Sequence, residues 1–313
     1  MSRRKYKKKK GVYSENITDS YDESARVITD HEAHRDVVYE LPSYPKQIKE
    51  CFMIQMRRYT KQKVMWIAII LLVAIPVIFL VFYNVELLKP MLPSTDVTNI
   101  YIASLLQFMP VIVPLLAAIA CGSMISQEFN ERTVYLSLPL PMSRSAFYLG
   151  KFLAGLVLIE GVVTAAYGMT MILAMTVTSI TYTKEIFVSM LIMLVYVFFC
   201  CSLTYMMSTK LKRGSTILPF VILFVVMPII SVVLAQFISG DWAMNIASYL
   251  PSFSPEMALF SLGSSAPFSL YGLILSPFKA VPGKNAAVMM TVTFILGVIM
   301  LVIGDRIIKR RDM

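Results

Sequence analysis

The chain has 313 residues, of which 57% are hydrophobic and only 15% are charged, and its formal net charge is +10. Globular proteins average about 45–50% apolar and about 25% charged residues, so this composition argues against a soluble enzyme or a nucleic-acid-binding protein. The mean hydropathy of +0.68 instead indicates a membrane protein. The 4 Cys are scattered, so neither a disulfide framework nor a Cys-rich metal site is predicted.

Residues 1–42 have the composition of a disordered segment. Seven of the first ten residues are Lys or Arg, and a stretch rich in Ser, Asp and Glu follows without an apolar period. His31 and His34 are one residue too close for the zinc-binding HExxH motif, so no metal ion is predicted there. We therefore predict a polybasic cytoplasmic tail without a packed core.

Residues 43–63 show the periodicity of a basic amphipathic helix. One stripe of this helix would be apolar and is formed by Ile48, Cys51, Phe52, Met56 and Tyr59. The basic residues fall largely outside that stripe and are Lys46, Lys49, Arg57, Arg58 and Lys61. Such a helix directly before a membrane span is expected to lie along the cytoplasmic interface. The alternative is a helix that merely extends the first span.

A transmembrane domain is predicted over residues 64–305. Six apolar stretches occur in it, at about 64–83, 101–125, 147–178, 186–207, 216–238 and 286–303. Each is close to the length that a bilayer core of about 30 Å requires, which is about 20 residues. We therefore predict an all-α membrane protein with six transmembrane helices, followed by a basic C-terminal segment, 306–313.

The distribution of Lys and Arg predicts the orientation of these spans. If the N-terminus is cytoplasmic, 25 of the 29 Lys and Arg lie in cytoplasmic segments. Because basic residues near spans are retained in the cytoplasm, both termini are expected there, in a multi-pass protein of the cell membrane. The longest outer segment, 239–285 between spans 5 and 6, is rich in Pro and contains short apolar pieces. We expect short or re-entrant helices in it.

Two prolines interrupt the second span. Pro110 and Pro114 are four residues apart, and each removes one backbone hydrogen-bond donor from the helix. We therefore expect a helix hinge at these two residues.

Glu160 is the one ionisable residue well inside a predicted span. It lies about 13 Å beyond Lys151 along a helix with a rise of about 1.5 Å per residue. A charged side chain at such depth costs about 2.5–3.5 kcal/mol on insertion scales. Glu160 is therefore expected either to face a substrate pathway or to be protonated and hydrogen-bonded to a neighbour such as Thr164.

The segment 126–146, between spans 2 and 3, predicts a short cytoplasmic helix. Glu128 and Arg132 are four residues apart and would share its polar edge, with Phe129 on its apolar edge. Pro139 and Pro141 end the helix. A second helix is then expected to begin at the cap residue Ser143, with Lys151 at the level of the lipid headgroups.

This segment resembles the membrane subunits, or permeases, of ABC-2-type transporters. The resemblance is carried by Glu128, Thr133, Leu136, Leu138, Pro141, Ser143, Arg144 and the Lys151 of a Tyr-Leu-Gly-Lys sequence. The number of spans, the basic helix before the first and the large outer segment are similar to that family too, so the resemblance covers about residues 43–310. Arg132 departs from it, because the family usually has Gly before the Thr.

The resemblance implies half of a transmembrane pathway, with a coupling helix that docks on a separate ATP-binding subunit. The contact would be made by Glu128, Phe129, Glu131, Arg132 and Thr133. A second permease subunit, identical or different, would complete the pathway, membrane lipid would surround it, and export is the expected direction.

The chain is expected to have no ATPase site of its own. A P-loop needs GxxxxGK followed by Ser or Thr, and neither Gly150 with Lys151 nor Gly283 with Lys284 lies in such a sequence. No catalytic residue, bound metal or cofactor is therefore predicted in this chain, and no nucleic-acid partner. ATP and Mg²⁺ would bind to the partner subunit.

The alternative function is a stand-alone secondary transporter or channel driven by an ion gradient. Such proteins usually place several charges inside the membrane or break two helices at corresponding positions of a repeat. Glu160, Pro110 and Pro114 are weak evidence for that pattern. The segment 126–146 favours an ATP-driven permease instead.

Overall fold

The computed structural model describes residues 43–63, 66, 69–70, 74, 109–122, 124–130, 143–178, 184–210, 217–226, 229–230 and 283–310. Within these ranges the secondary structure is helical, without strands. The predicted tail 1–42, almost all of the first span and nearly the whole outer segment 239–285 lie outside them. The all-α prediction is thus confirmed for the described part of the chain.

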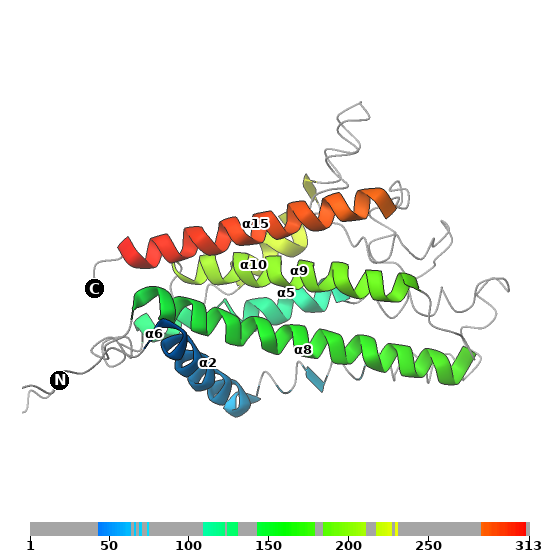
Figure 1. Cartoon of the computed structure of the whole chain (residues 1–313), viewed down its shortest axis with the longest axis horizontal. Coiled ribbons are helices and arrows are strands. Elements are labelled where there is room, and N and C mark those ends of the chain that lie inside the picture. The colour runs from blue at the N-terminus through cyan, green and yellow to red at the C-terminus, as the bar shows by residue number, and fades with distance from the viewer. Residues whose placement is uncertain are drawn as a thin grey trace, which may run out of the picture. The chain divides into compact units, whose positions relative to one another are not determined.

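Three helices are long and apolar enough to cross a membrane (Figure 1). They are α8 (Arg144–Thr178), α9 (Lys184–Ser208) and α15 (Gly283–Arg310), and they coincide with the third, fourth and sixth predicted spans. Helix α8 begins where Ser143 was expected to cap it, because the Ala146 amide donates to Ser143 Oγ over 3.2 Å.

The second predicted span is not one continuous helix. Helix α5 (Met109–Ala120) runs through Pro114 without ending, and the chain then turns at Cys121 and Gly122 before α6 (Met124–Asn130). A Cβ on Gly122 would stand only 2.4 Å from the carbonyl oxygen of Ala118, so the turn needs a residue without a side chain there. The predicted span 101–125 is therefore interrupted by a turn near its C-terminal end.

Within the described residues, two short elements lie in the fifth predicted span. Helix α10 (Ile217–Val221) continues into the π-helix η2 (Ile222–Val226). Helix α10 packs against α5 and α9. The rest of the predicted span, to residue 238, is described only at residues 229–230.

The core lies around α9, which packs against α15, α8, α5 and α6. Aromatic residues fill its contact with α8: the ring centroids of Tyr148 and Tyr205 are 4.6 Å apart, and those of Phe152 and Tyr205 are 5.6 Å apart. The Tyr205 hydroxyl also donates to the backbone carbonyl of Tyr148 over 2.9 Å. This buried hydroxyl thus has an acceptor inside the bundle, as an apolar environment requires.

Helix α2 (Tyr44–Lys61) packs along the first turns of α8. Its buried residues are spaced four apart and are Gln47, Cys51, Gln55 and Tyr59. The buried line therefore shares Cys51 and Tyr59 with the predicted apolar stripe but includes two glutamines. The helix ends at Lys61, because Gln62 has an extended backbone with φ −85° and ψ 109°. Helix α2 is thus separate from the residues that begin the first predicted span.

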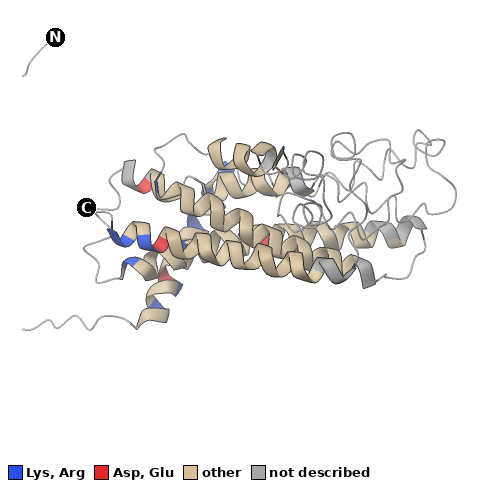
Figure 2. Cartoon of the chain, turned by 90° about the horizontal axis from the view of Figure 1, so that it is seen from above, with Lys and Arg blue, Asp and Glu red and all other residues tan. Residues whose placement is uncertain are grey.

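Charged residues of the described helices are unevenly distributed (Figure 2). Lys and Arg gather toward the end where α8 begins and α15 ends, whereas the middle of the helices is almost uncharged. Among the described residues, α2 and α6 contribute their charges at this same end.

Candidate functional site

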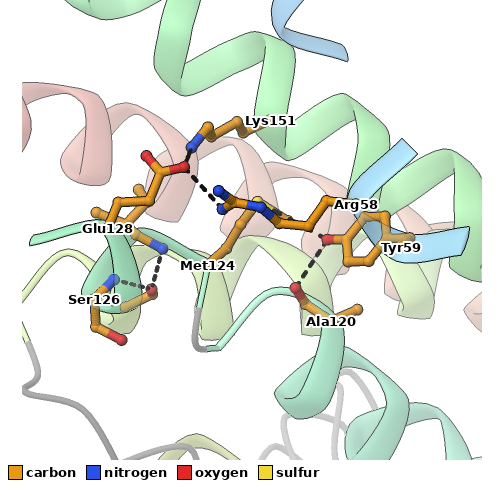
Figure 3. A network of polar contacts seen from close by, with 9 residues as sticks. Arg58, Tyr59, Ala120, Met124, Ser126, Glu128 and Lys151 are labelled. Atoms are coloured by element: carbon orange, nitrogen blue, oxygen red, sulfur yellow. Dashed lines mark hydrogen bonds and ion pairs between the residues drawn. The ribbon is translucent and has the colours of Figure 1, made fainter. Parts of the chain in front are cut away.

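Glu128 of α6 lies between two basic residues from two other helices (Figure 3). Its carboxylate Oε1 accepts a hydrogen bond from Arg58 Nη1 of α2 over 3.0 Å. The same oxygen forms an ion pair with Lys151 Nζ of α8. This Arg58–Glu128–Lys151 cluster therefore joins three helices: α2, which precedes the first predicted span, α6 at the end of the second, and the start of α8.

Burial differs strongly among the three side chains. The side chains of Glu128 and Lys151 are 8% and 4% exposed, whereas that of Arg58 is 39% exposed. Removing one partner of a buried ion pair typically costs 3–5 kcal/mol, because the other charge stays buried without compensation. The Glu128–Lys151 pair is therefore the buried part of the cluster, and Arg58 connects it to the surface.

Lys151, which was expected at the level of the lipid headgroups, is buried where α2, α6 and α8 meet. Its Nζ turns inward to Glu128 and lies 4.2 Å from the centroid of the Phe147 ring. An ammonium group over an aromatic face gains a cation–π interaction in addition to the ion pair. Nothing in the residues around Lys151 indicated that α6 would bring a carboxylate against α8.

Helix α6 is anchored by Ser208, near the end of α9. Ser208 Oγ accepts hydrogen bonds from the backbone amides of Ile125 and Ser126, over 3.1 and 3.3 Å. These amides belong to the first turn of α6, where a helix has no acceptor of its own for them. Ser208 thus acts as an N-cap supplied by another helix, and it fixes the position of Glu128 one turn further along.

Tyr59 joins α2 to the end of α5. Its hydroxyl donates to the carbonyl of Ala120 over 2.9 Å and lies 3.9 Å from the sulfur of Met124 (Figure 3). Burial raises the pKa of Tyr59 well above its ordinary value, because the phenolate would lose its hydration. The side chain therefore stays a neutral donor that satisfies the last carbonyl of α5.

Gln47 joins the beginning of α2 to the beginning of α8. Its Oε1 accepts a hydrogen bond from the backbone amide of Ser143 over 2.9 Å. Because Ser143 also caps α8, the same residue orients α8 and holds α2 beside it. Helix α2 is thus attached to its neighbours by polar contacts at both ends.

Gly150 permits the close contact between α2 and α8. A Cβ at this position would stand 2.6 Å from Cys51 Cβ and 2.7 Å from the carbonyl oxygen of Ile48. Both distances are below any ordinary van der Waals contact, so only glycine allows the two backbones to approach in this way. This approach places Lys151, the next residue, at the α2–α6–α8 junction.

Several predicted contact residues lie outside the described part of the chain. These are Glu131, Arg132 and Thr133, while Phe129 is described only as part of the α6 backbone. Of the predicted hinge residues, Pro110 and Pro114 both lie within α5, and Pro114 is buried. The described break in the backbone comes after Ala120, at the Cys121–Gly122 turn.

Glu160 lies in the middle of α8 and is partly buried. Within the described residues no hydrogen bond or ion pair joins it to another side chain, Thr164 included. The neighbouring Gly161 is exposed, and a Cβ on it would meet no atom within 4 Å. Glu160 is thus separate from the Arg58–Glu128–Lys151 cluster and borders an open part of the α8 surface.

Arg58, Gln47 and Ser208 have roles that the sequence patterns did not predict. Arg58 was assigned only to a polar face, although it lies next to the apolar stripe where a side chain can reach inward. Ser208 is separated from Ile125 by 83 positions, and no sequence pattern indicated that it would cap α6. Among the residues that the structure describes, no three His, Cys, Asp or Glu come together as a metal site would require.

The comparison with protein families identifies the family of this chain. The model of the ABC-2 family transporter protein matches residues 46–313, from the first turn of α2 to the end of the chain. A search among curated proteins found no match. The matched range includes all three residues of the Arg58–Glu128–Lys151 cluster and the three long apolar helices. The chain therefore belongs to the ABC-2 transporter family and is a membrane permease of an ABC-type transporter.

Proposed function

We propose that this permease is driven by a separate ATP-binding subunit, and that α6 is the coupling helix on which this subunit acts. One observation carries the proposal: α6 is short, and its Glu128 is held by basic residues of two different helices. A displacement of α6 must therefore move Arg58 and Lys151 with it or break a buried ion pair, which costs several kcal/mol.

In this proposal the residues of the segment 126–146 divide into two roles. Glu131, Arg132 and Thr133, together with Phe129, contact the ATP-binding subunit directly. Glu128 is buried on the side toward α2 and α8, so it transmits the movement instead of meeting the partner surface. ATP and Mg²⁺ are bound and used on the partner subunit, and this chain supplies no group to the hydrolysis.

The movement would reach the pathway through α8. Lys151 lies in the second turn of this 35-residue helix, and its other end is at Thr178. Glu160 lies between these points and is proposed to line the pathway, with α5 as a moving element that carries Pro110 and Pro114. Two permease subunits, identical or different, would enclose the pathway, and we propose export as its direction.

The proposed orientation has both termini in the cytoplasm of a cell-membrane protein. It is supported by the gathering of Lys and Arg at the end where α8 begins and α15 ends (Figure 2). Retention of basic residues on the cytoplasmic side would place α2 and α6 there, within reach of a cytoplasmic ATP-binding subunit.

Arg58→Gln tests the proposal, with Arg57→Gln as the matched control. Both substitutions remove one positive charge from α2, but Arg57 is exposed and Arg58 contacts Glu128. The permease would be purified with its ATP-binding subunit and reconstituted in liposomes. Arg58→Gln is expected to lower the substrate transported per ATP hydrolysed, while Arg57→Gln leaves this ratio unchanged.

An unchanged ratio in both variants would contradict the coupling role of the cluster. Transport that follows an ion gradient and needs neither ATP nor the second subunit would instead support the alternative, a stand-alone secondary transporter or channel. Glu160 would then be the residue to examine, since it is the acidic residue at mid-span depth within the described helices.

A further inference from the structure

The face of α2 that turns away from α8 combines basic and apolar side chains. Its basic residues are Lys46, Lys49, Arg57 and Lys61, and all four are exposed. Met53 and Ile54 lie between them and are 46% and 59% exposed. Glu50 is the acidic residue on this face within α2. We call this surface the outer face of α2.

These residues form one continuous arc on the helix. At 3.6 residues per turn, positions 46, 49, 53, 57 and 61 recur on the same side, opposite the buried line of Cys51 and Tyr59. Four basic residues and one acidic residue give this arc a net charge of +3. A ligand of this surface must therefore be anionic and must also cover exposed apolar side chains.

The edge of the outer face is connected to the Arg58–Glu128–Lys151 cluster. Arg58 is the next residue after Arg57, and its side chain is 39% exposed. Within the cluster two basic side chains share one carboxylate oxygen, Glu128 Oε1. The cluster thus adds positive charge beside the outer face and does not neutralise it.

We propose that the outer face of α2 binds anionic phospholipids of the membrane leaflet on which it lies. Lipid phosphates would contact Lys46, Lys49, Arg57 and Lys61, while Met53 and Ile54 enter the upper part of the acyl region. An acidic protein surface would satisfy the charge but would leave no reason for two large apolar side chains between the basic residues. The proposal rests on the membrane location of α2, and not on coupling to an ATP-binding subunit.

Trp66 provides a reporter next to this face. Its indole Nε1 donates to the carbonyl oxygen of Thr60, in the last turn of α2, over 3.0 Å. Trp66 is 51% exposed, so a lipid at the end of α2 can reach it. The chain has 2 Trp, and Trp242→Phe therefore leaves Trp66 as its single source of indole fluorescence.

The experiment uses the full-length Trp242→Phe permease in vesicles with brominated phosphatidylglycerol or brominated phosphatidylcholine at equal mole fraction. Bromine quenches indole fluorescence on contact, so the two quenching curves give the relative affinity for anionic over zwitterionic lipid. We expect a preference of at least about fivefold for phosphatidylglycerol, the contribution of about one surface basic residue. Substituting Lys46, Lys49, Arg57 and Lys61 together by Gln should remove this preference. Gln is chosen because it keeps a high helix propensity.

A second variant controls for the polybasic tail. Substituting Arg3, Arg4, Lys5 and Lys7 by Gln removes the same amount of charge from the segment 1–42 and should leave the Trp66 preference in place. Thermal unfolding of both variants identifies any loss of folding. The proposal would be overturned if the preference for phosphatidylglycerol disappeared only in the tail variant. Equal quenching by both lipids in the Trp242→Phe permease would overturn it too. So would a four-residue α2 variant that keeps its lipid preference but loses an associated ATP-binding subunit during purification.

Discussion

Gly150 of α8 and Cys51 of α2 are in closer contact than any residue with a side chain at position 150 would allow. A Cβ on Gly150 would stand 2.6 Å from the Cys51 Cβ. This contact holds α2 against α8 one residue before Lys151, so the geometry of the Arg58–Glu128–Lys151 cluster depends on it.

Gly150→Ala should therefore destabilise the permease. Overpacking of a tight contact typically costs about 1–3 kcal/mol, because one helix has to move away from the other. Thermal unfolding of the detergent-purified protein would measure the loss. Gly161→Ala is the control on the same helix, since a Cβ there meets no atom within 4 Å. There the greater helix propensity of Ala should leave stability unchanged or slightly raised. Equal unfolding temperatures for the two variants would show that α2 does not need the close approach.

Glu128→Ala should be among the most destabilising single substitutions in the described residues. It leaves Lys151, whose side chain is 4% exposed, without its carboxylate, and we expect a loss of about 3–5 kcal/mol. Adding Lys151→Met should recover part of this loss, because the buried charge is then gone as well. A double-mutant cycle measured by denaturant unfolding gives the interaction energy. Additive effects of the two substitutions would mean that the ion pair contributes nothing.

Ser208→Ala tests the cap that α9 supplies to α6. The substitution removes the acceptor of the Ile125 and Ser126 amides and should cost about 0.5–2 kcal/mol, as loss of an N-cap does. Ser202→Ala is the matched control on α9. Among the described residues, Ser202 Oγ donates within its own helix, to the Phe198 carbonyl over 2.7 Å. Hydrogen exchange of the α6 amides should increase in the first variant alone.

Cys51 should report the charges of the cluster through its reactivity. Burial raises the pKa of its thiol, Lys151 lowers it, and Glu128 and Glu50 raise it further. The reactive thiolate should therefore form only at a pH above that of an ordinary thiol. Glu128→Gln removes a charge that raises the pKa of Cys51, so the pH midpoint of maleimide labelling should move down. Lys151→Met removes a charge that lowers this pKa, so the midpoint should move up.

The labelling would be done in a chain whose Cys121, Cys200 and Cys201 are replaced by Ala, so that one thiol remains. Asp305→Asn serves as the charge control, because Asp305 is not among the groups that shift the pKa of Cys51. The pH midpoint is compared and not the rate, since a change in access alters the rate without moving the midpoint. Midpoints that coincide in all variants would show that the cluster does not act on Cys51.

Local sequence patterns were sufficient to predict the helices whose apolar residues lie within one continuous run. The apolar runs of α8, α9 and α15 predicted these helices, and Ser143 predicted where α8 begins. A run of about 20 apolar residues indicates such a helix because that length crosses a bilayer. A helix cap is recognised from the few residues around it. The basic helix before the first span was likewise predicted, because its periodicity lies within its own 18 residues.

The tertiary structure alone decided which residues meet. The sequence indicated Glu128 and Lys151 as members of one motif, but not that they form a buried ion pair or that Arg58, 70 positions before Glu128, joins them. Periodicity tells which residues share a face of a helix, and it does not tell what that face contacts. The same reason explains why Gln47 and Gln55 are buried in α2 and why α6 is capped by Ser208 of another helix. Such contacts depend on how close two backbones can come, which here is decided by Gly150.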